Sequence, residues 1–103
     1  MKLIEVFGAK NRIRIIRELT RKDMYVNELI DSIGMDGSTA LYHLNTLEEA
    51  GLIASYRVGR RKYYTLTASL ILKASPPPNR EFILQAIPIK EQKEKVEGSS
   101  NRN

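Results

Sequence analysis

Four cationic side chains are concentrated within six residues near the middle of the sequence: Arg57, Arg60, Arg61 and Lys62. The segments on either side, 53–58 and 62–67, are rich in β-branched and aromatic residues, and Gly59 lies between them. This pattern predicts two short strands joined by a turn, with the cations at its tip. Charged residues on strands also prevent sheets from pairing edge to edge, but four in six residues exceed that need. Cations grouped in this way are suited to contacting phosphate groups.

The segment before this hairpin predicts a helix with an uncharged polar face. Asp36 or Ser38 can cap its beginning, and it runs to about Ala50 because Gly51 favours a stop. At about 100° per residue, its core stripe consists of Ala40, Leu44 and Leu47. Hydroxyl and amide groups lie opposite the stripe or alongside it: Ser38, Thr39, Tyr42, Asn45 and Thr46. Such groups can donate to and accept from base edges, and a Thr methyl can contact thymine.

A polar helix face alone is more often simply a hydrated surface, and the basic hairpin beside this one is what favours nucleic acid. His43 lies at the edge of the core stripe, where two interpretations stay open: a half-buried structural histidine or a phosphate contact. Leu41 flanks the other edge, and we expect it to pack on a neighbouring helix.

Two further helices are predicted before the polar one. Residues 9–22 carry Ile15, Ile16 and Leu19 on one side, and a cationic stripe on the other: Lys10, Arg14, Arg17 and Arg21. Asn27 can cap a second, shorter helix that ends at Gly34. The break at residues 34–37, between two short amphipathic helices, is typical of a helix-turn-helix.

The net charge of +5 is distributed unevenly along the chain. Residues 1–22 contain seven cations and two acids, residues 23–56 contain six acids and no Lys or Arg, and the hairpin adds four cations. Clustered cations are the electrostatic pattern expected of a protein with a polyanionic partner.

Composition excludes several other classes of function. The chain has 103 residues, enough for one domain, with no cysteine and a single histidine, so disulfides, thiolate metal sites and His clusters are excluded. Catalysis needs a base, a nucleophile and a group to orient them, and the sequence offers no such set. We therefore expect no enzyme activity, no metal and no cofactor. Because no stretch approaches the roughly 20 apolar residues of a membrane span, we expect a soluble, cytoplasmic protein.

Residues 3–67 resemble the winged helix-turn-helix regulators of the ArsR type. Short matches in the right order carry the resemblance: Arg12 to Leu19, Asn27 to Leu29, Ser38-Thr39, His43-Leu44, Leu47, Glu49 to Ile53, Gly59 to Arg61 and Tyr63 to Leu66. The fold implied is mainly α with a small β-hairpin (α+β), consisting of a three-helix core, a two-stranded wing and flanking dimerisation helices. The function implied is that of a dimeric, sequence-specific regulator of transcription that binds double-stranded DNA. A winged-helix module for protein–protein interaction in a larger assembly is the alternative.

The resemblance implies a recognition helix at about residues 37–50 in the major groove and a basic wing, 57–62, on phosphate or in the minor groove. Together with the polar helix face, it yields one set of expected DNA contacts: Ser38, Thr39, Tyr42, His43, Asn45, Thr46, Arg57, Arg60, Arg61 and Lys62. The cysteines of the family's metal sensors are absent, which excludes sensing through those thiolates. Leu41 occupies a position at which the family commonly has a serine. The recognition helix also has no cation, so we expect the flanking regions to supply the affinity.

The two ends of the sequence predict contacts with a second copy. Residues 1–75 are expected to form the DNA-binding domain, 76–89 a Pro-rich linker and a short helix capped by Asn79, and 90–103 a disordered polar tail. The terminal segments have more apolar side chains than so small a core can bury. We expect terminal helices to form a homodimer through them: Leu3, Ile4, Phe7, Leu70, Ile71, Phe82 and Ile83.

Overall fold

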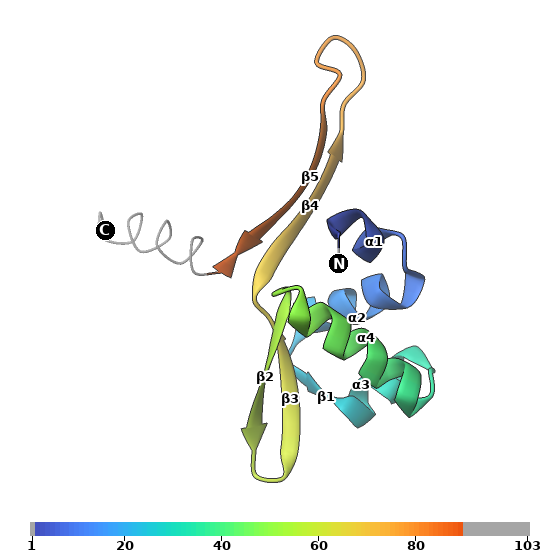
Figure 1. Cartoon of the computed structure of the whole chain (residues 1–103), viewed down its shortest axis with the longest axis vertical. Helices are drawn as coiled ribbons and strands as arrows, with labels where there is room; N and C mark the ends of the chain where they lie inside the picture. The colour runs from blue at the N-terminus through green and yellow to red at the C-terminus, as the bar shows by residue number, and fades with distance from the viewer. Residues whose placement is uncertain (1, 90–103) are drawn as a thin grey trace, which may run out of the picture.

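The computed structural model describes residues 2–89, which form helices packed on one small sheet and a separate two-stranded hairpin (Figure 1). The helices are α1 (Leu3–Phe7), α2 (Lys10–Arg21), α3 (Val26–Ile33) and α4 (Gly37–Glu49). The strands are β1 (Met24–Tyr25), β2 (Ile53–Val58), β3 (Arg61–Leu66), β4 (Ala68–Ala74) and β5 (Phe82–Pro88). The predicted α+β class, with helices and a hairpin wing, is confirmed.

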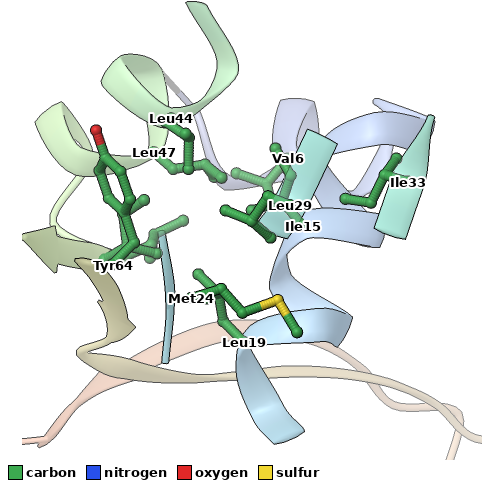
Figure 2. Packing of buried hydrophobic residues seen from close by; sticks show 11 residues of the cluster. Val6, Ile15, Leu19, Met24, Leu29, Ile33, Leu44, Leu47 and Tyr64 are labelled. Atoms are coloured by element: carbon green, nitrogen blue, oxygen red, sulfur yellow. The ribbon is translucent and has the colours of Figure 1, made fainter. Parts of the chain in front are cut away.

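The core lies where α2, α3 and α4 meet the antiparallel sheet of order β1-β3-β2. Figure 2 shows side chains from the four helices, β1 and β3 converging: Val6, Ile15, Leu19, Met24, Leu29, Ile33, Leu44, Leu47 and Tyr64. Each helix buries one apolar stripe at helical spacing, as the sequence pattern predicted. The core therefore fixes which face of α4 points outward.

The turn between α3 and α4 is formed by the residues the sequence singled out. Gly34 ends α3 in the left-handed conformation, with φ of 80°, and Asp36 caps α4 by accepting a hydrogen bond of 2.8 Å from the Thr39 backbone N–H. This hydrogen bond, with those from the Ser38 and Thr39 hydroxyls, holds the pKa of the Asp36 carboxyl below its usual value. The expected cap at Asn27 was wrong. Tyr25 precedes the first turn of α3, and its backbone N–H donates to the Glu28 carboxylate over 3.2 Å.

The wing is a tight antiparallel hairpin formed by β2 and β3. Its register runs from Ile53 opposite Leu66 to Val58 opposite Arg61, which leaves a loop of only Gly59 and Arg60. Gly59 has φ of 62°, the conformation required at the first position of a type II′ turn. The Tyr56 hydroxyl donates to the Asp23 carboxylate over 2.5 Å, which ties the middle of β2 to the loop after α2. The cationic tip is thus held in a defined position relative to the helices.

Residues 68–88 differ from the prediction, because they form a second antiparallel hairpin instead of terminal helices. The register pairs Ala68 with Pro88 and Ala74 with Phe82, and the prolines of 76–78 lie in its loop. The terminal helices predicted at Leu70 and Ile71 and from Asn79 were therefore wrong, and residues 76–89 are not a linker followed by a helix. Short aliphatic runs do not distinguish helix from strand, and here the Pro-rich turn brings two such runs together as strands.

Two further expectations concern the chain as a whole. None of the helices within residues 2–89 is long and apolar enough to cross a membrane. The polar tail predicted at 90–103 lies outside the described residues.

Candidate nucleic-acid interface

The outer face of α4 carries the polar residues that the sequence predicted there. Ser38, Tyr42 and Asn45 are exposed, Tyr42 by 61%, whereas Leu44 and Leu47 are fully buried. Leu41 was expected to pack on a neighbouring helix, but it is 44% exposed and joins the outer face. The face therefore offers polar groups beside one aliphatic side chain, a combination able to contact base edges and a thymine methyl.

Three hydroxyl groups of α4 are already used within the helix. The Ser38 and Thr39 hydroxyls donate to the Asp36 carboxylate over 2.8 and 3.0 Å, and the Thr46 hydroxyl donates to the Tyr42 carbonyl over 2.8 Å. Their oxygens can still accept a hydrogen bond. The Tyr42 hydroxyl and the Asn45 amide have no hydrogen-bond partner among residues 2–89. They are the donors that α4 can direct outward.

Arg12 of α2 lies against α4, and sequence reasoning did not assign it to the site. Its Nε donates to His43 Nδ1 over 3.2 Å, and its guanidinium carbon lies 5.9 Å from the centre of the Tyr42 ring. Burial, and then the charge of Arg12, lower the pKa of His43. Of the two interpretations of His43, the half-buried structural one fits this hydrogen bond. The spacing gave a signal, because Arg12 stands three and four residues before Ile15 and Ile16, on the side of α2 that faces its neighbours.

The Arg12–His43 contact predicts a pH-dependent stability. The folded pKa of His43 is lowered from an unfolded value near about 6.5, so the unfolded chain binds more protons below that pH. The stability that His43 contributes is therefore complete above that pH and is lost as the pH falls toward the folded pKa. We expect the drop in melting temperature between pH 7.5 and pH 5 to be smaller for His43→Gln than for the unchanged protein. Equal drops would mean that His43 does not titrate across the transition.

The four wing cations lie beyond the core, and among the described residues only Arg61 interacts electrostatically with a nearby acid, the Glu28 carboxylate, without forming an ion pair with it. Within residues 2–89 the ion pairs join Arg21 to Glu18, Lys22 to Glu28 and Lys73 to Glu81, and none includes a wing cation. Arg57 and Lys62 are directly opposite each other in the β2–β3 register. Like charges opposite each other across two strands are destabilising. The wing thus keeps a repulsive pair that a bound anion would neutralise.

Aromatic rings hold two of these cations in place. The Arg61 guanidinium lies 4.4 Å from the centre of the Tyr25 ring, and Lys62 Nζ lies 5.5 Å from that of Tyr64. The Tyr25 ring in turn contacts Tyr63 edge to face. Because cation–π contacts leave the charge uncompensated, the two side chains are oriented but still positive.

A hollow of about 280 Å³ lies between the wing turn and the start of α3. Its lining combines wing cations with residues at the N-terminal end of the helix: Tyr25, Val26, Asn27, Arg60, Arg61 and Lys62. The N-terminal end of a helix carries partial positive charge, which adds to that of the cations. Asn27 thus lies beside the candidate site, although the sequence indicated only a capping role for it.

The cationic stripe predicted on α2 is partly engaged within the protein. Arg14 donates to the Ile33 carbonyl over 2.7 Å, at the end of α3, and Arg21 pairs with Glu18 over 2.9 Å. Lys10 and Arg17 are exposed. Half of the stripe therefore already has partners, and the wing remains the denser group of uncompensated cations.

Helices packed on a small sheet, an exposed polar helix after a tight turn and a cationic hairpin define a winged helix-turn-helix domain. A family model described as a helix-turn-helix domain matches residues 7–56. The chain is 33% identical to a crystallised protein described as a "possible transcriptional regulator for arsenical resistance", with a TM-score of 0.59, over 64% of this chain and 69% of that one. The chain belongs to the ArsR-type winged helix-turn-helix transcriptional regulators.

Two other relatives bear on the size and assembly of such proteins. An uncharacterised HTH-type transcriptional regulator of Bacillus subtilis, YceK, is 33% identical over 66 residues, which cover 62% of this chain and 66% of that protein. A Mycobacterium bovis fragment, described as a homodimeric winged helix-turn-helix DNA-binding domain, is 26% identical with a TM-score of 0.58, over 62% of this chain and 59% of that one. The chain spans between 52% and 66% of the length of the curated relatives it matches.

Proposed function

We propose that this protein is a sequence-specific regulator of transcription that binds double-stranded DNA, with α4 in the major groove and the wing on phosphate or in the minor groove. The observation that carries the proposal is the wing, where none of the four cations forms an ion pair within residues 2–89 and Arg57 stands directly opposite Lys62. Such repulsion is relieved when a polyanion binds. A wing whose cations served only to prevent edge-to-edge strand pairing would not need two like charges directly opposite each other.

The two elements have different roles in this proposal. The wing and the hollow beside α3 contact the DNA backbone, which supplies affinity regardless of sequence. The exposed donors Tyr42 and Asn45, with the oxygens of Ser38, Thr39 and Thr46 and the aliphatic Leu41, contact base edges and discriminate between sequences. Arg12 brings a positive charge beside His43, so α4 is not without a nearby cation.

We further propose that the protein acts as a homodimer in the cytoplasm, where it meets DNA. Two copies related by a two-fold axis would present two α4 helices to successive major grooves, about 34 Å apart. The homodimeric relative from Mycobacterium bovis supports this arrangement. On α1, Leu3, Ile4 and Phe7 remain candidates for part of the contact. No catalytic reaction forms part of the proposal.

The test is the selection of bound duplexes from a random pool, followed by binding measurements on the selected duplex and a scrambled one. We expect the selected sequence to bind at least about 10³-fold more tightly, with an affinity that falls steeply as salt rises. Binding without preference would contradict sequence-specific recognition. No duplex binding at low salt would instead favour the alternative, a winged-helix module for protein–protein interaction.

A further inference from the structure

The β4–β5 hairpin has one face without any charged or polar side chain. Side chains along a strand point alternately to its two faces. Two residues that are paired across the two strands point to the same face, so every second pair of the register lies on one face of the hairpin. That face, called here the apolar hairpin face, consists of Ala68, Leu70, Leu72, Ala74, Phe82, Leu84, Ala86 and Pro88. The opposite face carries Ser69, Lys73 and Gln85 among its aliphatic residues, and Lys73 pairs with Glu81 over 2.9 Å. The apolar hairpin face is therefore the one that has no polar group to keep in water and is better suited to burial.

Within residues 2–89, the protein covers only the half of the apolar hairpin face that lies nearest the core. Ala68, Leu70 and Ala86 pack against the core cluster, and α1 contacts β5. Farther along the hairpin, Leu72 is 49% exposed and Phe82 is 66% exposed. Figure 1 shows why, because the upper part of the hairpin extends beyond α1 with no other helix or strand of residues 2–89 beside it. The face thus continues from the core into open solvent.

A two-stranded hairpin with an exposed apolar face needs another surface packed against that face. An isolated two-stranded hairpin is at best marginally stable in water, and a third layer or strand is needed to hold it. An occupant with charged groups would leave them unpaired against this face, so the occupant must be apolar. Residues 90–103 do not qualify, because their only large aliphatic residue is Val96.

We infer that the apolar hairpin face packs against the same face of a second copy across a two-fold axis. A surface that contacts its own copy must be complementary to itself, and a face that is aliphatic and aromatic throughout meets that condition without any pairing of charges. The inference rests on the proposed function, which requires two copies, and it names the surface that joins them. It also replaces the helices predicted after the wing: Leu72, Phe82 and Leu84 lie in the contact, whereas Ile71 and Ile83 lie on the other face.

The test compares the same substitution on the two faces of one strand. Leu72→Asp introduces a charge on the apolar hairpin face, and Ile71→Asp, the matched control, introduces it one residue away on the opposite face. In sedimentation equilibrium the unchanged protein should have twice the chain mass of 11.8 kDa at micromolar concentration. We expect Leu72→Asp to raise the dimer dissociation constant roughly 100-fold or more, because its carboxylate would be buried unpaired, and Ile71→Asp to change it little. A monomeric unchanged protein, or equal effects of the two variants, would overturn the inference.

Cross-linking keeps the test decisive if Leu72→Asp fails to fold. The chain has no cysteine, so Leu72→Cys and Ile71→Cys each introduce a single thiol that a short bis-maleimide can link only between copies. Efficient linking at position 72 and poor linking at 71 supports the inference, and the reverse overturns it. Duplex binding at low salt separates this result from the proposed function. A folded monomeric Leu72→Asp should keep its salt-dependent contact through the wing, whereas loss of binding in every variant would contradict the function instead.

Discussion

Replacing all four wing cations by glutamine should remove most of the salt dependence of DNA binding. Each phosphate contact contributes about 0.9 to the log–log slope, so losing the wing should lower the slope by about three to four units for each bound copy. At physiological salt the affinity should fall on the order of 10²- to 10³-fold, because charge-assisted contacts to phosphate are lost together. Fluorescence anisotropy on one labelled duplex at several salt concentrations measures both quantities. The variant combines Arg57→Gln, Arg60→Gln, Arg61→Gln and Lys62→Gln.

The matched control lowers the net charge by the same amount away from the wing. It combines Arg21→Gln, Lys22→Gln, Lys73→Gln and Arg80→Gln, of which the first three lie in exposed ion pairs. Its slope should change far less. The wing variant should also keep its melting temperature, since removing the repulsion between Arg57 and Lys62 offsets the lost contact between Arg61 and Tyr25. Equal slopes for the two variants would mean that the protein responds to net charge alone and that the wing has no special contact.

The parts of the fold that the sequence predicted correctly are those marked by local backbone chemistry. The α3–α4 turn needs a residue with positive φ and then a cap, and Gly34 and Asp36 supply them. The wing turn needs a glycine at its first position, and Gly59 stands between two β-rich segments. These requirements act over a few residues, so they can be recognised without knowledge of the tertiary structure.

The wrong predictions concern structure that depends on distant partners. Residues 70–72 are aliphatic with no decisive period, and they become a strand because Leu84 to Ala86 pair with them across the Pro-rich turn. The Arg12–His43 hydrogen bond joins residues 31 positions apart, which a single helix wheel does not reveal. The use of the Ser38 and Thr39 hydroxyls by Asp36 is a local effect of a different kind. It followed from known capping chemistry and could have been read from the sequence.

These findings place the residues best able to contact base edges in the middle of α4. Where a hydroxyl already donates within the helix, it can only accept from a base, and acceptance alone distinguishes fewer base pairs. Asn45 can do both at once, and a bidentate amide is the usual partner of adenine. The specificity of this protein should therefore depend more on Asn45 and Tyr42 than on the three hydroxyls.

Asn45→Ala should lower discrimination between the selected duplex and its single-base variants by about 10- to 100-fold at one base pair of the site. A good bidentate contact to a base contributes about 1–3 kcal/mol of discrimination, and the amide of Asn45 has no partner within residues 2–89 that would compete for it. Tyr42→Phe should have a smaller effect, because the ring near Arg12 remains and only the hydroxyl is lost. Competition anisotropy against duplexes substituted at each position measures the change.

Gln85→Ala is the matched control, since it replaces an exposed amide by a methyl on the polar face of the second hairpin, far from α4 in the chain. It should leave every base preference intact. The salt slope should stay the same in Asn45→Ala, because a base contact neutralises no phosphate. If Asn45→Ala instead weakened all duplexes equally, Asn45 would contact the backbone or support the fold. If no base preference changed, α4 would not be the helix that reads the sequence, and the specificity would have to come from the deformability of the DNA beneath the wing.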